Sequence, residues 1–338
     1  MTRNVKILVL NLIFFFTFLN VKAQDIHFSQ FYTTPLLQNP ANAGFFNCDY
    51  RLIANYRNQW RSVTKPFTTF HASGDIRRIK GKNKNIIGLG LDASVDKAGD
   101  SKFTTTQFGF AGSVHRTLDK FSHHYLGGGI MLGMTSANID YTNLLFSDQY
   151  IPFQSQVATQ ENVALSTLTY FDLSAGVAYN FIPPTFQNSF TMGLAVFHIN
   201  KPKKSFLDDD SSKVFRKLVF NMGANLHASS RFEFYPKLQY SLQGPNHELV
   251  MGSFVRINLD KMKNSKYGVY LGPWLRWNDA WVIVTRFDVD QFSFAFNYDI
   301  TISDFSSPSE SKGGPELSII YIGCIPHFNK KIVFCPRF

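Results

Sequence analysis

The sequence predicts an all-β protein, a transmembrane antiparallel β-barrel of about 14 strands. Three observations predict it. Apolar and polar residues alternate along most of the chain, the first residues resemble a secretion signal, and the composition is rich in aromatics and poor in charge. Alternation with a period of two gives an extended strand one apolar and one polar face. A barrel strand needs both, because it lies between lipid and a polar lumen.

The alternation is clearest over Gln291–Ser303, where one face of the segment is wholly apolar. That face carries Phe292, Phe294, Phe296, Tyr298, Ile300 and Ile302. Further segments of the length that a tilted membrane strand needs are separated by Gly, Asn, Asp, Pro and Lys clusters. The predicted strands lie near residues 50–59, 66–78, 86–97, 102–117, 123–137, 165–181, 188–200, 214–228, 231–242, 246–259, 266–277, 280–289, 291–304 and 314–323.

A secretory signal peptide is predicted over residues 1–23. Arg3 and Lys6 precede an apolar run from Ile7 to Leu19, and small residues up to Ala23 suit signal peptidase. The alternative is a retained anchor, but the run is short for a membrane span of about 20 residues.

Cleavage after Ala23 divides the chain into two further parts. Residues 24–49 form an N-terminal periplasmic or plug segment, and residues 50–338 form the barrel. An even strand count places both ends of the barrel on the periplasmic side, with longer loops outside. The stretches Asn138–Ala164 and Lys201–Ser212 are the predicted outer loops, where a partner would bind.

The composition supports a membrane barrel and argues against nucleic acid as a partner. Aromatic residues make up 16% of the chain and charged residues only 17%, against about a quarter in soluble domains. Barrels use aromatics at both membrane interfaces and few charges toward lipid. The net charge of +10 comes from basic residues scattered over strand ends and loops, where they can meet anionic headgroups or acidic partners.

The three cysteines allow one disulfide in an oxidising envelope. A chain reversal at Pro326–Lys330 favours Cys324 with Cys335, which leaves Cys48 over. No CxxC or His/Cys spacing indicates a metal site, and no cofactor site is apparent. No spacing singles out a nucleophile, base and orienting group, so no catalytic residues are predicted and the protein is not expected to be an enzyme.

The two ends of the mature chain carry its most specific motifs. They are QDIHFSQFY and NPANAG near the start, YRNQW in the first predicted strand, and GGPELSIIYIG and CPRF near the end. Asn39-Pro40 begins a turn, Gly44 allows it to be tight, and Trp60 suits a membrane edge. With these motifs the chain resembles the PorP/SprF family of the Bacteroidota type IX secretion system.

The resemblance implies an outer-membrane barrel of a Gram-negative cell with no known catalysis. Some family members belong to the core secretion and gliding machinery, and others help to export or hold a large surface adhesin. The implied partners are other type IX components, the C-terminal domain of a secreted adhesin, and outer-membrane lipid. The competing function is an outer-membrane channel for small or hydrophobic solutes, since a barrel of this size can enclose a lumen.

The motifs also name candidate site residues. A docking or plug element in the periplasmic mouth would use Asn39, Pro40, Gly44, Tyr56, Arg57, Gln59 and Trp60. The alternative is that these residues only cap the barrel and order its first strand. A charged lumen network is a second expectation, either for selectivity or as pairing that spares buried charge. Its members would be Arg57, Arg256, Arg276 and Arg286 with Asp92, Asp172, Asp288 and Asp299.

Overall fold

The computed structural model describes residues 25–325 except 64, 82–83, 100–101, 142–165, 184–187, 207–211, 260–265 and 305. The predicted signal peptide, most of the loop Asn138–Ala164, and Cys335 lie outside the described residues. Among the described residues, no helix has the length and apolar character needed to cross a membrane.

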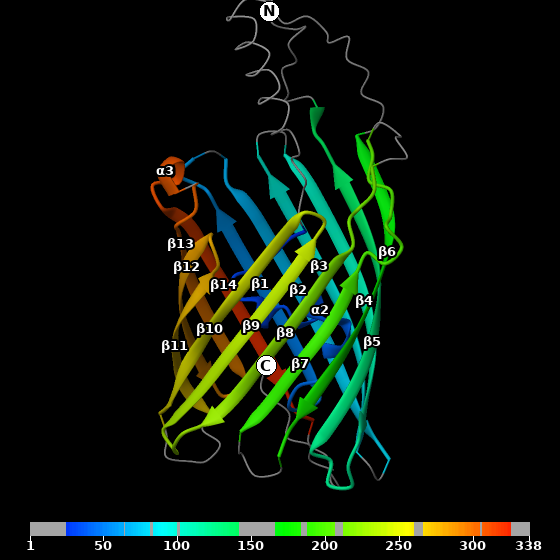
Figure 1. The fold of residues 1–338 in the computed structure, drawn as a ribbon, viewed down its shortest axis with the longest axis vertical. Helices are drawn as coiled ribbons and strands as arrows, with labels where there is room; N and C mark the ends of the chain where they lie inside the picture. The colour runs from blue at the N-terminus through cyan, green and yellow to red at the C-terminus, as the bar shows by residue number, and fades with distance from the viewer. Residues whose placement is uncertain are drawn as a thin grey trace, which may run out of the picture.

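The described residues form one closed antiparallel barrel of fourteen strands, which confirms the predicted fold (Figure 1). Each strand pairs with its neighbours in the sequence, and β1 and β14 close the ring. The strands are β1 (Tyr50–Gln59), β2 (Phe67–Lys80), β3 (Asn85–Ala98), β4 (Phe103–Thr117), β5 (His124–Asn138), β6 (Thr167–Phe181), β7 (Ser189–Phe197), β8 (Lys217–His227), β9 (Phe232–Gln243), β10 (Asn246–Asn258), β11 (Tyr267–Arg276), β12 (Ala280–Val289), β13 (Phe292–Thr301) and β14 (Lys312–Gly323).

The alternation in the sequence becomes the two faces of the barrel wall. Along β13, exposed and buried residues alternate without interruption. Phe292, Phe294 and Phe296 are each 44% exposed on the outer face, whereas Asn297 and Asp299 are buried on the inner face. The outer face therefore suits lipid, and the inner face is polar as in other membrane barrels.

The two ends of the barrel differ in their connections. At the end where β1 begins and β14 finishes, here called the proximal end, β12 and β13 are joined by residues 290–291 alone. At the opposite, distal end, β5 and β6 are joined by residues 139–166 and β7 and β8 by residues 198–216. Outer-membrane barrels have short periplasmic turns and longer outer loops, which predicts that the distal end faces the cell surface.

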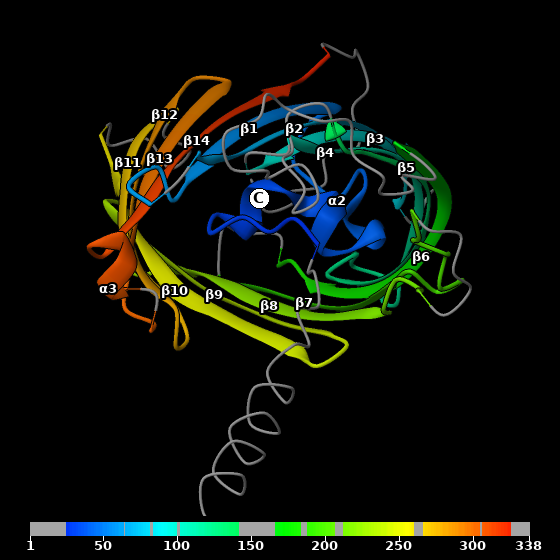
Figure 2. The same cartoon turned by 90° about the horizontal axis from the view of Figure 1, so that it is seen from above.

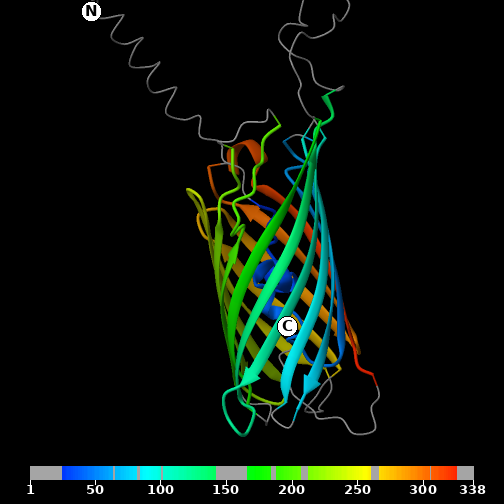
Figure 3. The same ribbon diagram turned by 90° about the vertical axis from the view of Figure 1, so that its right-hand side faces the viewer.

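The segment before β1 runs through the inside of the barrel and is here called the plug (residues 25–49; Figures 2 and 3). It contains three short helical turns: η1 (Phe31–Thr33), α2 (Pro35–Gln38) and η2 (Pro40–Asn42). The Asp25 amide donates to the Gln243 side chain, at the distal end of β9. The Asp49 amide donates to the Gly323 carbonyl at the proximal end, so the plug spans the lumen from one end to the other.

The disulfide joins Cys48 to Cys324, and the predicted Cys324–Cys335 pairing is wrong. Closure of the barrel explains the pairing, because Tyr50 at the start of β1 lies opposite Gly323 at the end of β14. The two cysteines flank this pair, and their Cα atoms are 4.6 Å apart. The bond therefore fastens the end of the plug to the seam that closes the barrel.

Candidate functional site

The NPANAG turn of the plug packs directly on backbone of the wall at inward-facing glycines. A Cβ built on Gly129 of β5 would lie 2.5 Å from the Ala41 nitrogen, and one on Gly176 of β6 would lie 2.0 Å from Asn39 Oδ1. A Cβ on Gly88 of β3 would lie 2.1 Å from the Ala43 carbonyl oxygen. No larger residue fits at these three positions without moving the plug.

Asn39 shapes the turn and also ties it to the wall. Its side-chain oxygen accepts a hydrogen bond from the Ala41 amide at 2.9 Å, which caps η2, and Pro40 occupies the first position of that turn. Its Nδ2 donates to the Val177 carbonyl of β6 at 2.9 Å. One fully buried side chain thus performs both the turn and the docking roles.

Gly44 ends the turn in a conformation that glycine adopts most easily. Its φ is +66°, and its amide donates to Asp75 Oδ2 at 2.8 Å. The Asp75 carboxylate also accepts two hydrogen bonds from Arg51, at 2.9 and 2.7 Å. The turn therefore rests on a buried, fully paired charge of the β1–β2 wall.

Carbonyl oxygens of the same stretch are also bound by the wall. Ser113 Oγ donates to the Ala43 carbonyl at 2.6 Å, and His115 Nε2 lies 2.7 Å from the Ala41 carbonyl. Arg77 donates to the Phe46 carbonyl at 2.5 Å. Backbone groups buried in this way need such partners, and here the strands β2 and β4 supply them.

A second set of contacts holds the two residues after Phe28, Ser29 and Gln30, here called the SQ pair. The Glu316 carboxylate of β14 accepts hydrogen bonds from the Ser29 and Gln30 amides, each at 3.0 Å. Ser29 Oγ donates to Asp299 Oδ2 at 2.7 Å. Asp299 in turn lies 3.1 Å from both Arg57 and Arg276. Two carboxylates and two guanidinium groups thus surround one buried turn of the plug.

Aromatic packing anchors the plug to the opposite wall. The Phe31 and Tyr32 rings lie 5.5 and 5.0 Å from the Trp274 ring of β11. Tyr32 also meets Phe254 of β10 edge-on at 5.1 Å. Such pairs stabilise beyond the area that they bury.

The distal end of the plug is held by a cluster of charges, here called the latch (Asp25, Asp172, His198 and Lys217). His198 Nε2 lies 2.7 Å from Asp25 and its Nδ1 lies 3.0 Å from Asp172. Burial alone would lower the pKa of His198, but the two carboxylates outweigh burial and raise it to about 9. Burial alone would raise the pKa of Asp25, but His198 and Lys217 hold it well below its usual range.

The structure brings together only part of the predicted site. Asn39, Pro40, Gly44 and Arg57 lie inside the lumen in the contacts described above. The other three, Tyr56, Gln59 and Trp60, make none of these contacts. Tyr56 is 39% exposed on the outer face, and Gln59 ends β1 at the distal end, followed by Trp60, whose ring meets Phe67.

The predicted charged network is present as pairs within the described residues. Arg57 and Arg276 contact Asp299, while Arg256 and Arg286 contact Asp288 at 3.9 and 3.0 Å. Asp92 and Asp172 instead face histidines, His71 at 4.0 Å and His198 at 3.0 Å. No group of three or more potential metal ligands occurs in the described part of the chain.

Sequence reasoning missed Ser29, Gly88, Gly129, Glu316 and His198. Inward-facing glycines in successive strands were the available signal, since an interior glycine marks close approach of another backbone. The sequence also contained a signal for Glu316, because it is a lone acidic residue at an inward position of an apolar strand, and a buried charge there needs a partner.

Comparison with known proteins decides the family. The model of the type IX secretion system membrane protein family PorP/SprF matches residues 20–321. The chain belongs to the PorP/SprF family. The match covers the plug and nearly the whole barrel of this PorP/SprF protein. It contains the motifs QDIHFSQFY, NPANAG and YRNQW and the first nine residues of GGPELSIIYIG, whereas CPRF lies beyond it.

Solved structures resemble this PorP/SprF protein in fold alone. The P. putida toluene transporter TodX shares 9% identity over 87% of this chain and 94% of its own, with a TM-score of 0.50. A Pseudomonas aeruginosa FadL homologue shares 9% identity over 84% and 92%, with a TM-score of 0.48. The CymD monoaromatic hydrocarbon channel shares 10% identity over 87% and 94%, with a TM-score of 0.49. None of the curated proteins compared with the chain matches it.

Proposed function

We propose that this protein is a plugged, non-enzymatic outer-membrane barrel of the type IX secretion system. It supports the export or surface anchoring of cargo, such as a gliding adhesin, through protein–protein contacts. The observation that carries the proposal is the attachment of the plug, whose backbone is bound by side chains of β2, β4 and β14. Family membership supplies the secretion system, and the barrel fold supplies the membrane.

The plug favours this function over diffusion of solutes. A diffusion channel needs a continuous hydrated path, whereas this plug spans the lumen and is fastened at both ends. The latch holds Asp25 at the distal end, and the disulfide holds Cys48 at the proximal end. Breaking several buried hydrogen bonds and ion pairs to move the plug would cost several kcal/mol, at about 1–3 kcal/mol for each group left unpaired.

The distal loops are the proposed contact surface for an adhesin's C-terminal domain. They connect strands at the end that is predicted to face the cell surface, and loops carried on a rigid scaffold are common binding elements. The proximal end would face other type IX components in the periplasm.

Gene deletion tests the function. A deletion strain should lose surface display or export of its cargo, and gliding where the organism glides, and the wild-type gene should restore them. Unchanged cargo, adhesin display and gliding in the deletion strain would refute the proposal. Purified protein in planar bilayers tests the channel alternative, because steady open pores would contradict a plugged barrel.

A pull-down from detergent-solubilised outer membranes distinguishes the two branches of the family. Recovery of a large adhesin with a secretion domain would make this barrel a partner of one cargo. Recovery of periplasmic ring or peptidoglycan-binding components would instead place it in the core machinery. Recovery of neither would count against the type IX function.

A further inference from the structure

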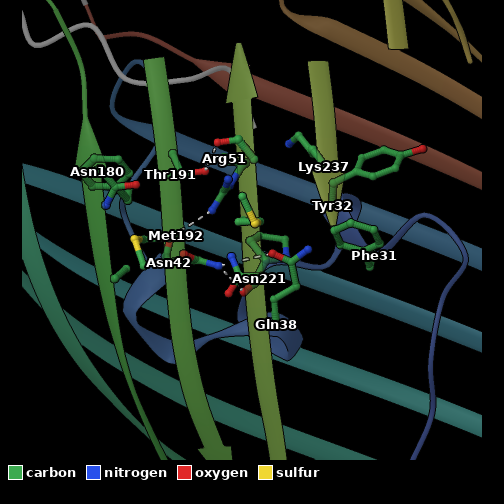
Figure 4. Close-up of a pocket in the computed structure, with 15 residues that line it drawn as sticks. Phe31, Tyr32, Gln38, Asn42, Arg51, Asn180, Thr191, Met192, Asn221 and Lys237 are labelled. Atoms are coloured by element: carbon green, nitrogen blue, oxygen red, sulfur yellow. Dashed lines mark hydrogen bonds between the residues drawn. The ribbon is translucent and has the colours of Figure 1, made fainter. Parts of the chain in front are cut away.

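One edge of β6 is unpaired toward the distal end of the barrel. β6 pairs with β5 along its whole length, Thr167–Phe181, but with β7 only over Ala175–Phe181 (Figure 1). Over this proximal half the inner face is covered as well, because Gln38 and Asn42 of the plug lie across a small cavity from Asn180 (Figure 4). The proximal half of β6 is therefore enclosed, whereas the distal half has no neighbouring strand on the side of β7.

The chain continues the β6–β7 ladder briefly and then leaves it. The Ile199 amide donates to the Leu173 carbonyl at 2.9 Å. Asn200 then imitates a strand with its side chain, since its Oδ1 accepts from the Leu173 amide at 3.1 Å and its Nδ2 donates to the Phe171 carbonyl at 2.8 Å. The edge of β6 thus still offers strand-type hydrogen bonds beyond the end of β7.

The stretch beyond these contacts is here called the free edge (Thr167–Phe171). Alternate residues of an antiparallel strand turn their amide and carbonyl groups to the same side, so Thr167 and Thr169 point theirs to the same side as Phe171. Within the described part of the chain, neither threonine has a backbone partner on that side, and the Phe171 amide has none. A row of unpaired amides and carbonyls is a template for a further strand.

The free edge lacks the features that protect the edges of native sheets. Such edges carry lysine, proline, an inward-pointing charge or a bulge, or another element covers them. Residues 166–171 contain no proline and no charged residue, and the β5–β6 ladder has no bulge. Threonine, tyrosine and phenylalanine favour strands, and Phe171 is 71% exposed. An unprotected edge of this kind indicates a partner strand.

The free edge lies at the distal boundary of the membrane and beyond it. The outward residues of β6 are apolar or aromatic from Phe171 to Phe181 and polar at Thr167 and Thr169. Ten residue steps of about 3.3 Å, tilted by about 40°, rise by roughly 25 Å, which is the height of the apolar band of a barrel. The two threonines therefore lie beyond the band, at the end predicted to face the cell surface.

A second copy of this chain fits the free edge poorly. Two copies in one membrane are related by an axis along the membrane normal, and the strands of each are tilted by about 40°. Their β6 strands would then cross at about 80°, whereas a ladder needs strands that run side by side. The geometry favours an extended segment of a different polypeptide.

Charge narrows the class of partner. Residues 198–217, which run from the end of β7 into β8, contain six lysines and arginines against three aspartates. Lys201 and Arg216 are exposed, and Arg216 donates to the Ile199 carbonyl at 3.1 Å, next to the start of the free edge. A neutral or acidic strand is thus acceptable there, whereas a basic one would meet like charge.

We propose that the free edge of β6 binds an extended, neutral or acidic segment of a partner polypeptide as an added β-strand. The site deepens the proposed function, on which the identification of the partner as exported cargo rests. Peptide binding can be measured on the purified barrel, so the failure of this site and the failure of the secretion role are distinguishable.

The test is a fluorescence anisotropy titration of the detergent-solubilised full chain with the fluorescein-labelled peptide TVEVTVEVT. We expect saturable binding by the wild type. Thr169→Pro removes an amide of the free edge and leaves the β5 ladder, so it should weaken binding about fivefold, the factor that corresponds to one net hydrogen bond. Thr169→Val keeps the amide and is the matched control, which should bind as the wild type does.

A change in the peptide keeps the test decisive even where Thr169→Pro disturbs folding. The same peptide with every backbone amide methylated has no backbone donors and should not bind the wild type. Equal binding of the methylated peptide, or equal binding by Thr169→Pro, would overturn the proposal. Absence of saturable binding to the wild type would overturn it as well, as expected where the chain itself covers the edge.

Two further outcomes would replace the assigned partner. Disulfide-linked dimers of Thr169→Cys in membranes, in a Cys335→Ser background, would overturn the proposal in favour of a second copy of the chain. Equal affinity for the peptide TVKVTVKVT would contradict the charge argument and hence the assigned class of partner strand.

Discussion

Gly44 of the plug and Gly88 of β3 are in backbone contact. A Cβ built on Gly44 would lie 2.5 Å from the Gly88 Cα, closer than real Cβ contacts allow. The plug therefore docks where two segments of the chain both lack side chains, and the fit depends on the wall as much as on the plug.

Gly88→Ala should displace the plug. The new methyl group would meet the Ala43 carbonyl at 2.1 Å, and we expect a loss of about 1–3 kcal/mol from overpacking. Gly128→Ala on β5 is the matched control, because a Cβ there has nothing within 4 Å. Thermal unfolding followed by electrophoretic mobility compares them, and equal midpoints for the two variants would show that the contact is not required.

Glu316→Gln should weaken the attachment of the SQ pair. The carboxylate accepts from both the Ser29 and Gln30 amides, whereas a carboxamide would turn an N–H donor toward one of them. We expect a destabilisation of about 1–3 kcal/mol, measured by urea unfolding in lipid vesicles. Glu310→Gln, an exposed site, is the control. Equal unfolding midpoints for Glu316→Gln and the wild type would exclude a role for this carboxylate.

Local pattern was enough to predict the barrel. The alternation with a period of two located β1, β13 and the other strands closely. It depends only on whether each residue faces lipid or lumen, which changes from one residue to the next along a strand. The NPANAG turn was also recognisable, since Asn39, Pro40 and Gly44 each have a local conformational role.

Contacts across the lumen could not be predicted in the same way. Ser29 and Glu316 are 287 residues apart, and alternation shows that Glu316 points inward without showing what it meets. The prediction of the disulfide partner was wrong for a related reason. Proximity in sequence favoured Cys335, whereas the seam between β1 and β14 brings Cys48 to Cys324 from 276 residues away. Tyr56, Gln59 and Trp60 share the YRNQW motif with Arg57, but Tyr56 points outward and Gln59 and Trp60 lie at the distal end of the strand.

Peptide mapping should find Cys48 linked to Cys324. Digestion of the unreduced protein and mass spectrometry should detect one crosslinked peptide pair, which disappears on reduction. Cys335→Ser should retain the crosslink, and Cys48→Ser should abolish it. A crosslink between Cys324 and Cys335 in the wild type would contradict the structure.

The latch should loosen as the pH rises toward 9. The pKa of His198 is raised from 6.5 to about 9, so its contribution to stability is complete below pH 6.5 and is lost as the pH passes about 9. The pKa of Asp25 is lowered from 3.8, so its contribution is present above that pH and is lost in strong acid. Between these limits His198 is charged between Asp25 and Asp172, with Lys217 3.8 Å from Asp25.

A nitroxide attached at Ile26→Cys, in a Cys335→Ser background, reports on the latch by its mobility. We expect a mobile component to grow as the pH rises through the raised pKa of about 9. His198→Gln should be mobile at every pH and show no step, because a carboxamide cannot carry the charge that holds Asp25. A spectrum that stays immobile to pH 10.5 in the wild type, or a step that survives in His198→Gln, would show that this histidine does not hold the plug.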